Sequence, residues 1–354
     1  MDLLTEARCQ IDEIDAQMAA LFEARMQAVQ KVSAYKKANR LAIYDKARET
    51  AVIAKNTARL QDATLRPYYA DLLQYQMDLA KQYEAAMMGQ NRVAYQGVEG
   101  AFAHIALQAL FPHAEAANYP TWDAVFLAVE AGDAAYGVLP FENSNAGDVG
   151  AVLDLCFKHN LSVVKQYDLS VNQNLLALPE SSIGQITDVY SHPQAIAQSE
   201  KFLKTLGLTA HPMENTAMAA KFVAESGDVS KAAIASVETA ALYHLQLLAP
   251  AINTDGDNTT RFIVVSKEAP TTGSRFSLLF TVDNKPGKLA EVIQGVAASG
   301  LNMESIKSRP MPHVPFEYYF YTELVGTPDQ AQTLLQALSK ICRTARLLGM
   351  TDAL

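Results

Sequence analysis

The sequence has few cysteines, no long apolar run and little positive charge, and each shortage excludes a class of protein. Only three of 354 residues are cysteine, Cys9, Cys156 and Cys342, and their wide spacing is typical of a reducing compartment. No apolar stretch approaches the roughly 20 residues needed to cross a bilayer. The formal net charge of −9 argues against nucleic acid as a partner, because phosphate binding needs a basic face.

Signatures of secretion, metals and nucleotides are missing as well. The first six residues are polar and acidic, unlike a secretory signal. There is no phosphate loop, no G-x-G-x-x-G and no H-E-x-x-H, and the seven histidines are dispersed. We therefore expect a cytoplasmic protein without a cofactor or a metal, which binds neither membrane nor nucleic acid. An anionic substrate would have to be held by cations that are concentrated locally.

Composition divides the chain into three segments. Residues 1–90 contain one proline and no glycine before Gly89, which predicts a helical domain of two long helices and a short one. Residues 91–268 alternate β-rich runs with helical segments, which predicts an α/β domain with largely parallel sheets. A linker precedes residues 274–354, whose βαββαβ order is typical of an α+β ferredoxin-like domain.

The first predicted helix carries positive charge on its apolar stripe. Apolar residues recur from Ile11 to Val32, and the same spacing places Arg8, Arg25 and Lys36 on this inward-facing stripe. Snorkelling explains any one cation, but three together favour an anion site. Arg25 and Lys36 are roughly 17 Å apart along the axis, whereas Arg8 lies roughly 25 Å beyond. If Arg8 takes part, an antiparallel second chain must supply it, so we expect an intertwined helical dimer.

Two further predicted helices add polar residues. The second begins near Asp45 and carries Arg48 and Glu49 on one face, where an ordinary surface ion pair is an equally good explanation. The third helix places the carboxyl of Glu84 on an apolar face, in line with Leu73, Met77, Ala80 and Met87.

Residues 3–49 resemble the helical class of chorismate mutases. The resemblance rests on Ile11-Asp12-x-x-Asp15, Arg25, Tyr35-Lys36 and Asp45-x-x-Arg48-Glu49. It implies that arginines hold the substrate carboxylates, that Lys36 hydrogen-bonds the ether oxygen of the breaking bond, and that Glu49 contacts the hydroxyl. Such a pericyclic reaction needs only a compact substrate conformer and charge stabilisation. The implied substrate-binding residues are Arg8 of the partner subunit, Arg25, Lys36, Asp45, Arg48, Glu49 and Glu84.

Two residues depart from that family pattern. Ala80 stands where many members have serine, and Glu84 where many bacterial members have glutamine. Because a carboxylate would repel the ether oxygen, Glu84 should act in its protonated form, which burial favours and Lys36 opposes. We predict mutase activity that declines as pH rises, and a flatter profile for Glu84→Gln.

Four polar clusters in the middle segment lie where predicted strands end. Helix capping explains each one alone, but four together favour a ligand site beyond the carboxyl ends of the strands. In this order the clusters resemble prephenate dehydratase over about residues 92–266. The matching motifs are Tyr95-x-Gly97-x-x-Gly100, Glu142-Asn143-Ser144, Ser191-His192-Pro193-Gln194 and Thr260-Arg261-Phe262.

This second resemblance implies two α/β lobes like those of periplasmic binding proteins, with the site in the cleft between them. Thr260 is the main catalytic candidate, and it would deliver or orient a proton to the leaving hydroxyl of prephenate. Arg261 could pair with a substrate carboxylate, although a structural role is as good an explanation. The other candidate substrate-binding residues are Glu142, Asn143, Ser144, Ser191 and Gln198.

The tail resembles the amino-acid-binding ACT regulatory domain of these dehydratases, through residues 284–289 and 306–310. Feedback inhibition by phenylalanine is implied. Lys307 stands where the family motif has glutamate, so the strength and selectivity of the inhibition stay open. The candidate regulatory residues are Asn284, Pro286, Gly287, Leu289, Ser308, Arg309 and Pro310.

The whole pattern predicts a homo-oligomeric bifunctional enzyme of phenylalanine biosynthesis. It would convert chorismate to prephenate and prephenate to phenylpyruvate. One alternative keeps the fold and changes the substrate to arogenate, or the reaction to a decarboxylation without aromatisation; the Thr260-Arg261-Phe262 motif favours the aromatising dehydratase. The other alternative is a non-catalytic amino-acid sensor, which would have no need for the cations on the first helix.

Overall fold

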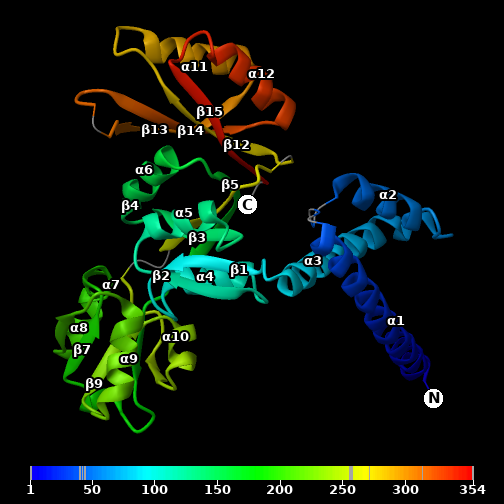
Figure 1. Cartoon of the computed structure of the whole chain (residues 1–354). Coiled ribbons are helices and arrows are strands. Elements are labelled where there is room, and N and C mark those ends of the chain that lie inside the picture. Colours follow the sequence, from blue (N-terminus) through cyan, green and yellow to red (C-terminus); the bar gives the residue numbers. More distant parts are fainter. Residues whose placement is uncertain are drawn as a thin grey trace. The chain divides into compact units, whose positions relative to one another are not determined.

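A computed structural model describes residues 2–39, 41, 43, 45–254, 258–270, 272–312 and 314–352 (Figure 1). The chain forms two compact units, Met1–Arg92 with His113–Glu115, and Val93–Pro112 with Ala116–Leu354. Within the described ranges, no helix is both long enough and apolar enough to cross a membrane.

The first unit is helical, which confirms the prediction for this segment. Its elements are α1 (Leu3–Asn39), α2 (Lys46–Thr57), a short 3-10 helix (Ala63–Leu65) and α3 (Arg66–Met88). Gly89 caps the C-terminus of α3, and its φ of 72° lies in the left-handed region that glycine adopts without strain. The same helix buries one stripe of side chains, made of Leu73, Met77, Ala80 and Glu84.

The apolar stripe of α1 is exposed, which differs from the expected inward orientation. Ile11, Ile14 and Leu21 keep 55%, 54% and 70% of their surface, and Ser33 is the one buried residue that α1 contributes among those described. Helix α1 is longer than α2 and α3, and it packs mainly against α3. A single chain therefore leaves much of this stripe without a covering element.

The second unit begins with an α/β lobe. Its sheet is mixed, because β3 pairs parallel with β1 but antiparallel with β11, and β11 pairs antiparallel with β5. The prediction of largely parallel sheets is therefore wrong: β11 returns to this lobe from the other lobe and runs against its neighbours. The elements are β1 (Arg92–Gln96), α4 (Phe102–Leu110), β2 (Glu115–Tyr119), α5 (Trp122–Ala131), β3 (Tyr136–Asn143), β4 (Gly147–Asp148), α6 (Gly150–Lys158), β5 (Ser162–Ser170) and β11 (Thr259–Ser266).

The second lobe lies between β5 and β11 in the sequence, so two segments connect the lobes. Its five-stranded sheet has the order β10-β6-β9-β7-β8 and is also mixed. The predicted two-lobed α/β architecture is confirmed. The elements are β6 (Asn174–Ala177), a 3-10 helix (Ile183–Gln185), β7 (Asp188–Ser191), α7 (Pro193–Gln198), α8 (Glu200–Leu206), β8 (Thr209–Pro212), α9 (Thr216–Ser226), β9 (Lys231–Ala235), α10 (Val237–Leu242) and β10 (Gln246–Ala249).

The C-terminal part has the predicted βαββαβ order, and its strands follow the order β13-β14-β12-β15. Strand β15 also meets β5 of the first lobe, where Gly349 pairs with Val163. A Cβ at Gly349 would collide with the Val163 carbonyl oxygen, so this close approach requires glycine. The elements are β12 (Arg275–Thr281), α11 (Lys288–Ala298), β13 (Asn302–Pro310), β14 (Tyr318–Val325), α12 (Pro328–Leu338) and β15 (Thr344–Thr351).

The two faces of the C-terminal sheet are buried by different partners. Leu278 faces α11 and α12, which cover one side of the sheet (Figure 1). Leu279, Tyr319 and Tyr321 face the other way and share one core with Val152 of α6 and its neighbours. Alternation along β12 therefore directs successive residues into two cores, and the second core fixes this domain against the first lobe.

Candidate active sites

Lys36 and Glu84, which the sequence predicts at the breaking bond, form an ion pair in the helical unit. The Lys36 Nζ lies 3.2 Å from Glu84 Oε1 and 3.3 Å from Oε2, and only the contact with Oε2 has hydrogen-bond geometry. The ammonium also donates to the Ile43 carbonyl oxygen at 2.6 Å. Because the Glu84 side chain is only 6% exposed, its ionised form depends on Lys36 for compensation.

A second ion pair connects α2 with α3. Glu49 lies 3.1 Å from Lys81, which also contacts Asp78 at 2.8 Å. Burial lowers the pKa of Lys81, but its hydrogen bonds to the two carboxylates outweigh burial and raise it above its usual value. Sequence reasoning missed Lys81, although its position three residues before Glu84 places both on neighbouring parts of one helix face.

The remaining cations of the helical unit are spread along it. Arg25 Nη1 donates to the Gln76 carbonyl oxygen at 3.4 Å. Asp45 accepts from the Arg48 backbone N–H at 2.9 Å and caps α2, while the Arg48 side chain is exposed. Arg8 is exposed and lies roughly 42 Å from Lys36 along the axis of α1. One chain therefore does not bring Arg8 to the ion pair of Lys36.

A cavity of about 170 Å³ is lined by residues from both lobes of the second unit. Of the sequence-predicted dehydratase residues, Asn143, Gln198 and Thr260 line it. Helices α4 and α9 begin at its wall, with Phe102 and Thr216 in their first turns. None of the described residues that line it is an arginine or a lysine, which differs from the expectation that local cations hold an anionic substrate.

Hydrogen bonds connect the polar residues of this cavity. Asn143 Nδ2 donates to Asn258 Oδ1 at 2.7 Å and to Thr260 Oγ1 at 2.9 Å. Asn258 Nδ2 and Gln173 Nε2 each donate to Gln198 Oε1 at 3.2 Å. Sequence reasoning missed Gln173, which belongs to no motif. It placed Asn258 at the start of the polar cluster that contains Thr260, but assigned it no role.

Glu142 and Arg261 lie on the opposite face of the same strands. Asn143 pairs with Thr260 in the register of β3 and β11, and Glu142 pairs with Arg261, so the two pairs point in opposite directions. Arg261 forms a bidentate ion pair with Asp168 at 2.8 and 2.9 Å, and this contact raises the pKa of Arg261. A role for Glu142 or Arg261 in binding substrate stays a prediction, because neither lines the cavity.

The other two predicted serines also lie away from the cavity lining. Ser191 is fully buried and donates to the Ile234 carbonyl oxygen at 2.7 Å. Ser144 is exposed and accepts from the Thr259 backbone N–H at 3.0 Å. Both contacts stabilise the backbone near the cavity, and a direct role in substrate binding stays a prediction.

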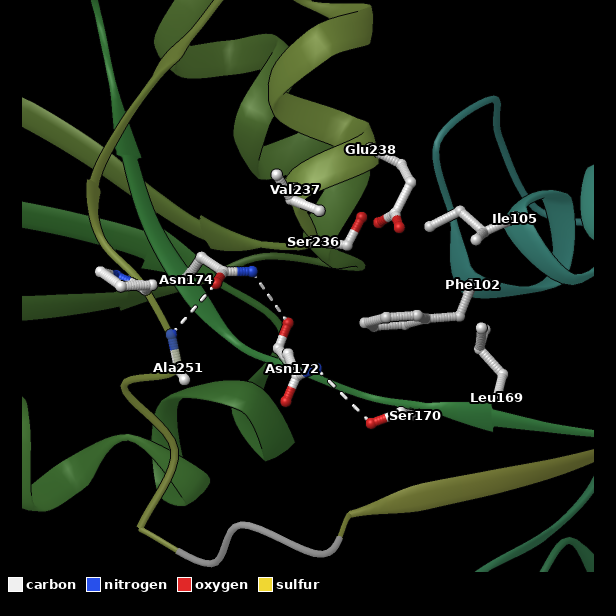
Figure 2. Close-up of a pocket in the computed structure, with 11 residues that line it drawn as sticks. Phe102, Ile105, Leu169, Ser170, Asn172, Asn174, Ser236, Val237, Glu238 and Ala251 are labelled. Atoms are coloured by element: carbon white, nitrogen blue, oxygen red, sulfur yellow. Dashed lines mark hydrogen bonds between the residues drawn. The ribbon is translucent and has the colours of Figure 1, made fainter. Parts of the chain in front are cut away.

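A larger cavity of about 260 Å³ is lined by other residues of the segment that connects the lobes (Figure 2). Asn172 and Asn174 line it, whereas Val171 and Gln173 line the smaller cavity, as expected for alternating side chains. Asn174 donates to the Asn172 carbonyl oxygen and accepts from the Ala251 N–H, each at 3.1 Å. No residue predicted from the sequence lines this larger cavity.

Two cations of the tail motif contact the first lobe. Lys307 Nζ lies 3.2 Å from Glu142 Oε1 and 2.5 Å from Asp148 Oδ1. Arg309 forms a bidentate ion pair with Asp154 at 3.0 and 2.5 Å, and Tyr319 donates to the same carboxylate at 2.6 Å. The residue that departs from the family motif, Lys307, is therefore part of a contact between domains.

The remaining regulatory candidates are placed as follows. Asn284 Nδ2 donates to the Phe316 carbonyl oxygen at 3.2 Å. Gly287 begins α11 with a φ of 86°, and Leu289 packs against the core under that helix. Ser308 and Pro310 are exposed on β13, which is the edge strand of the sheet, and Pro286 directly precedes Gly287.

Similarity to known proteins agrees with this geometry. The model of the prephenate dehydratase family matches residues 93–270, and that of chorismate mutase type II matches residues 7–85. The bifunctional chorismate mutase/prephenate dehydratase of Neisseria gonorrhoeae (strain ATCC 700825 / FA 1090) is 33% identical over 98% of this chain and 96% of that protein. The arogenate dehydratase/prephenate dehydratase 2, chloroplastic, of Arabidopsis thaliana is 36% identical over 73% and 72%.

Among solved structures, the prephenate dehydratase of Arthrobacter aurescens in complex with L-Phe has a TM-score of 0.68 and 26% identity, over 74% of this chain and 90% of that one. A helical unit joined to a two-lobed α/β unit with a cavity between its lobes defines an enzyme with two separate sites. The chain belongs to the family of bifunctional chorismate mutases/prephenate dehydratases. Its two reactions convert chorismate to prephenate and prephenate to phenylpyruvate.

Proposed function

We propose that the cavity between the lobes is the dehydratase site and that Thr260 delivers or orients the proton that the leaving hydroxyl takes up, with solvent as the ultimate source of that proton. One observation carries this assignment. Asn143 Oδ1 accepts from the backbone N–H groups of Asn145 and Ala146 at 3.0 and 2.8 Å, which fixes the orientation of its amide. Its Nδ2 faces Asn258 Oδ1, the Thr259 carbonyl oxygen and Thr260 Oγ1, and an amide nitrogen accepts no hydrogen bond. The hydroxyl proton of Thr260 therefore points away from Asn143 and is available to a ligand.

The chemistry suits a weak acid. The ring carboxylate of prephenate leaves as carbon dioxide, the electrons of that bond enter the ring, and the carbon–oxygen bond breaks. The departing oxygen takes a proton and leaves as water, while aromatisation drives the reaction. A positioned hydroxyl donor at that oxygen is sufficient assistance for such a step.

The first turns of α4 and α9 are the proposed binding groups for the substrate carboxylates. Both helices begin at the cavity wall, and the cap residue of α4, Ala101, makes no side-chain hydrogen bond to the helix. Backbone N–H groups at such helix starts attract anions and supply hydrogen bonds. Gln198 and Asn143 complete the proposed site, and Ser191, Ser144, Glu142 and Arg261 support it from outside the cavity.

In the helical unit, Lys36 and Glu84 act at the ether oxygen of chorismate in our proposal. The Lys36–Glu84 contact in a nearly buried position supports this assignment. The substrate carboxylates would be held by Arg25, Arg48 and Arg8 of the partner subunit, and the substrate hydroxyl would contact Glu49. Asp45 would cap the start of α2. The exposed apolar stripe of α1 supports the intertwined dimer, because a second α1 would cover that stripe and bring Arg8 to the site.

Residues 274–354 are the proposed ACT regulatory domain, which binds phenylalanine through Asn284, Pro286, Gly287, Leu289, Ser308, Arg309 and Pro310. The relative in complex with L-Phe and the βαββαβ order support this assignment. The other proposed domains are residues 1–90 and 91–268, consistent with α3 ending at Met88 and β11 at Ser266. The cytoplasmic location stays a prediction.

A coupled assay on the full chain tests the two-site proposal: chorismate is supplied, and prephenate and phenylpyruvate are measured. We expect Arg25→Ala to abolish chorismate consumption while added prephenate is still dehydrated. Thr260→Ala should stall the flux at prephenate. Full phenylpyruvate formation by Thr260→Ala would remove Thr260 from its proposed role. Arogenate supplied in parallel distinguishes the alternative substrate, because that reaction yields phenylalanine directly.

A further inference from the structure

Four side-chain amides form a chain along the dehydratase cavity, and its polarity is set at one end. Asn143 Oδ1 already accepts two backbone N–H groups, so its Nδ2 is the donor to Asn258 Oδ1 at 2.7 Å. Because the oxygen of Asn258 accepts, its Nδ2 faces Gln198 and donates to Gln198 Oε1. The orientation of each amide therefore follows from the one before it.

The chain ends on an acceptor that has no donor. Gln173 donates its Nε2 to Gln198 Oε1 at 3.2 Å, which leaves Gln173 Oε1 at the end of the chain. Gln173 is 3% exposed, and among the described residues this oxygen has no hydrogen-bond partner. Turning the amide over would place two oxygens against each other, so the acceptor is held in this orientation.

A buried acceptor without a donor is unfavourable and rare in folded proteins, and it indicates a ligand when it lines a cavity. Prephenate has two carboxylates, a ketone and one hydroxyl. At neutral pH the ring hydroxyl is therefore its only hydrogen-bond donor. We propose that Gln173 Oε1 accepts the hydrogen bond from the ring hydroxyl of prephenate, whose oxygen is also the one that accepts the hydrogen bond of Thr260 in the proposed site.

The amide chain then does two things at once. At one end it makes Thr260 a donor to the leaving oxygen, and at the other end it makes Gln173 an acceptor for the hydrogen on that oxygen. Together these contacts would select a substrate with a hydroxyl at this position and orient it before the bond breaks. Gln173 is a specificity-determining residue in this scheme, which rests on the proposed dehydratase site.

The test compares Gln173→Met, which keeps the length of the side chain and removes the acceptor, with wild type in the full chain. The kcat/KM for prephenate should fall about tenfold, the factor that corresponds to one lost hydrogen bond. Inhibition by phenylpyruvate, which lacks the ring hydroxyl, should stay within about twofold of wild type on the same basis. A purely structural role would weaken both ligands equally, and that result would overturn the proposal.

Two further measurements sharpen the result. Asn172→Ala is the matched control, because the neighbouring exposed side chain lines the other cavity and its change should leave dehydratase kinetics unaltered (Figure 2). Arogenate carries the same hydroxyl and an added ammonium, so an equal loss on both substrates is expected from Gln173→Met.

A loss confined to arogenate would mean that the ammonium is the donor and would refute the assignment to the hydroxyl. Mutase turnover of each sample reports correct folding of the helical unit and corrects for the amount of enzyme. Failure of the proposed dehydratase site is seen separately, as retained activity in Thr260→Ala whatever Gln173 does.

Discussion

Replacing Lys307 by methionine removes the ammonium that connects the tail to the first lobe and keeps most of the side chain. The Lys307 side chain is 15% exposed and its Nζ lies 3.2 Å from Glu142 Oε1, 2.5 Å from Asp148 Oδ1 and 5.3 Å from the centre of the Phe141 ring. Glu142 and Asp148 are paired between β3 and β4. Without the cation these two carboxylates face each other, and their repulsion acts on β3 directly beside Asn143.

The energy of the Lys307–Glu142 ion pair follows from Coulomb's law, reduced by solvent screening and by the cost of desolvation. At 3.2 Å one ion pair gains about 5 kcal/mol with an effective dielectric constant near 20, and about 1 kcal/mol in bulk water. The carboxylates are 38% and 43% exposed, so solvent screening and desolvation reduce the gain towards the lower figure. We expect a coupling energy of about 1–2 kcal/mol between Lys307 and Glu142, which corresponds to a factor of roughly 5–30 in an equilibrium constant.

The assay is a double-mutant cycle on dehydratase kcat/KM with Lys307→Met, Glu142→Gln and the double variant. Lys307→Met should lower activity the most, and removing Glu142 in that background should restore part of it by relieving repulsion. Lys285→Met is the matched control, because Lys285 is 70% exposed and pairs with Asp283 inside the C-terminal domain. Additive effects of the two changes, or wild-type kinetics in Lys307→Met, would refute the reasoning.

Two other outcomes are expected. Burial raises the pKa of Asp154, but hydrogen bonds from Arg309 and Tyr319 outweigh burial and lower it below its usual value. Its contribution to stability is therefore full above about pH 4 and is lost as pH falls through the folded-state pKa, so hydrogen exchange in β13 should rise only in acid, and less steeply for Asp154→Asn. Leu21→Glu on the exposed stripe of α1 should dissociate the proposed dimer in sedimentation and abolish mutase activity, with dehydratase activity retained.

Much of the fold follows from local patterns in the sequence. The scarcity of proline and glycine predicts the helical unit, and the order of strands and helices predicts an α/β domain and the βαββαβ domain. The two lobes were implied by the resemblance to prephenate dehydratase. Strand direction was harder to predict, because it depends on the chain crossing between lobes twice, and β11 returns against β3. The exposure of the apolar stripe of α1 could not be predicted from local sequence either. Periodicity shows that one face of a helix is apolar, but it does not show which element or which chain covers that face.

The candidate site was predicted in part, and strand geometry explains the difference. Glu142 and Asn143 belong to one motif, yet neighbours in a strand point to opposite faces, so only one of them lines the cavity. Gln173 was missed, and Asn258 was given no role, because a single amide has no sequence signature and its function depends on the side chains that it contacts. Contacts such as Lys307 with Asp148, 159 residues apart, also lie outside what spacing predicts.

The alternation of side chains along β3 and β11 also places contacts with the C-terminal domain next to the proposed dehydratase site. Strands β3 and β11 carry Asn143 and Thr260 on the cavity face, and Glu142 and Arg261 on the face that meets ionic partners. If the proposed regulation acts through Lys307, a change in its contact with Glu142 would act on the residue next to Asn143, which contacts Thr260. Regulation by the C-terminal domain would then need no movement of the lobes, because a change of register or tilt in one strand alters both faces of it at once.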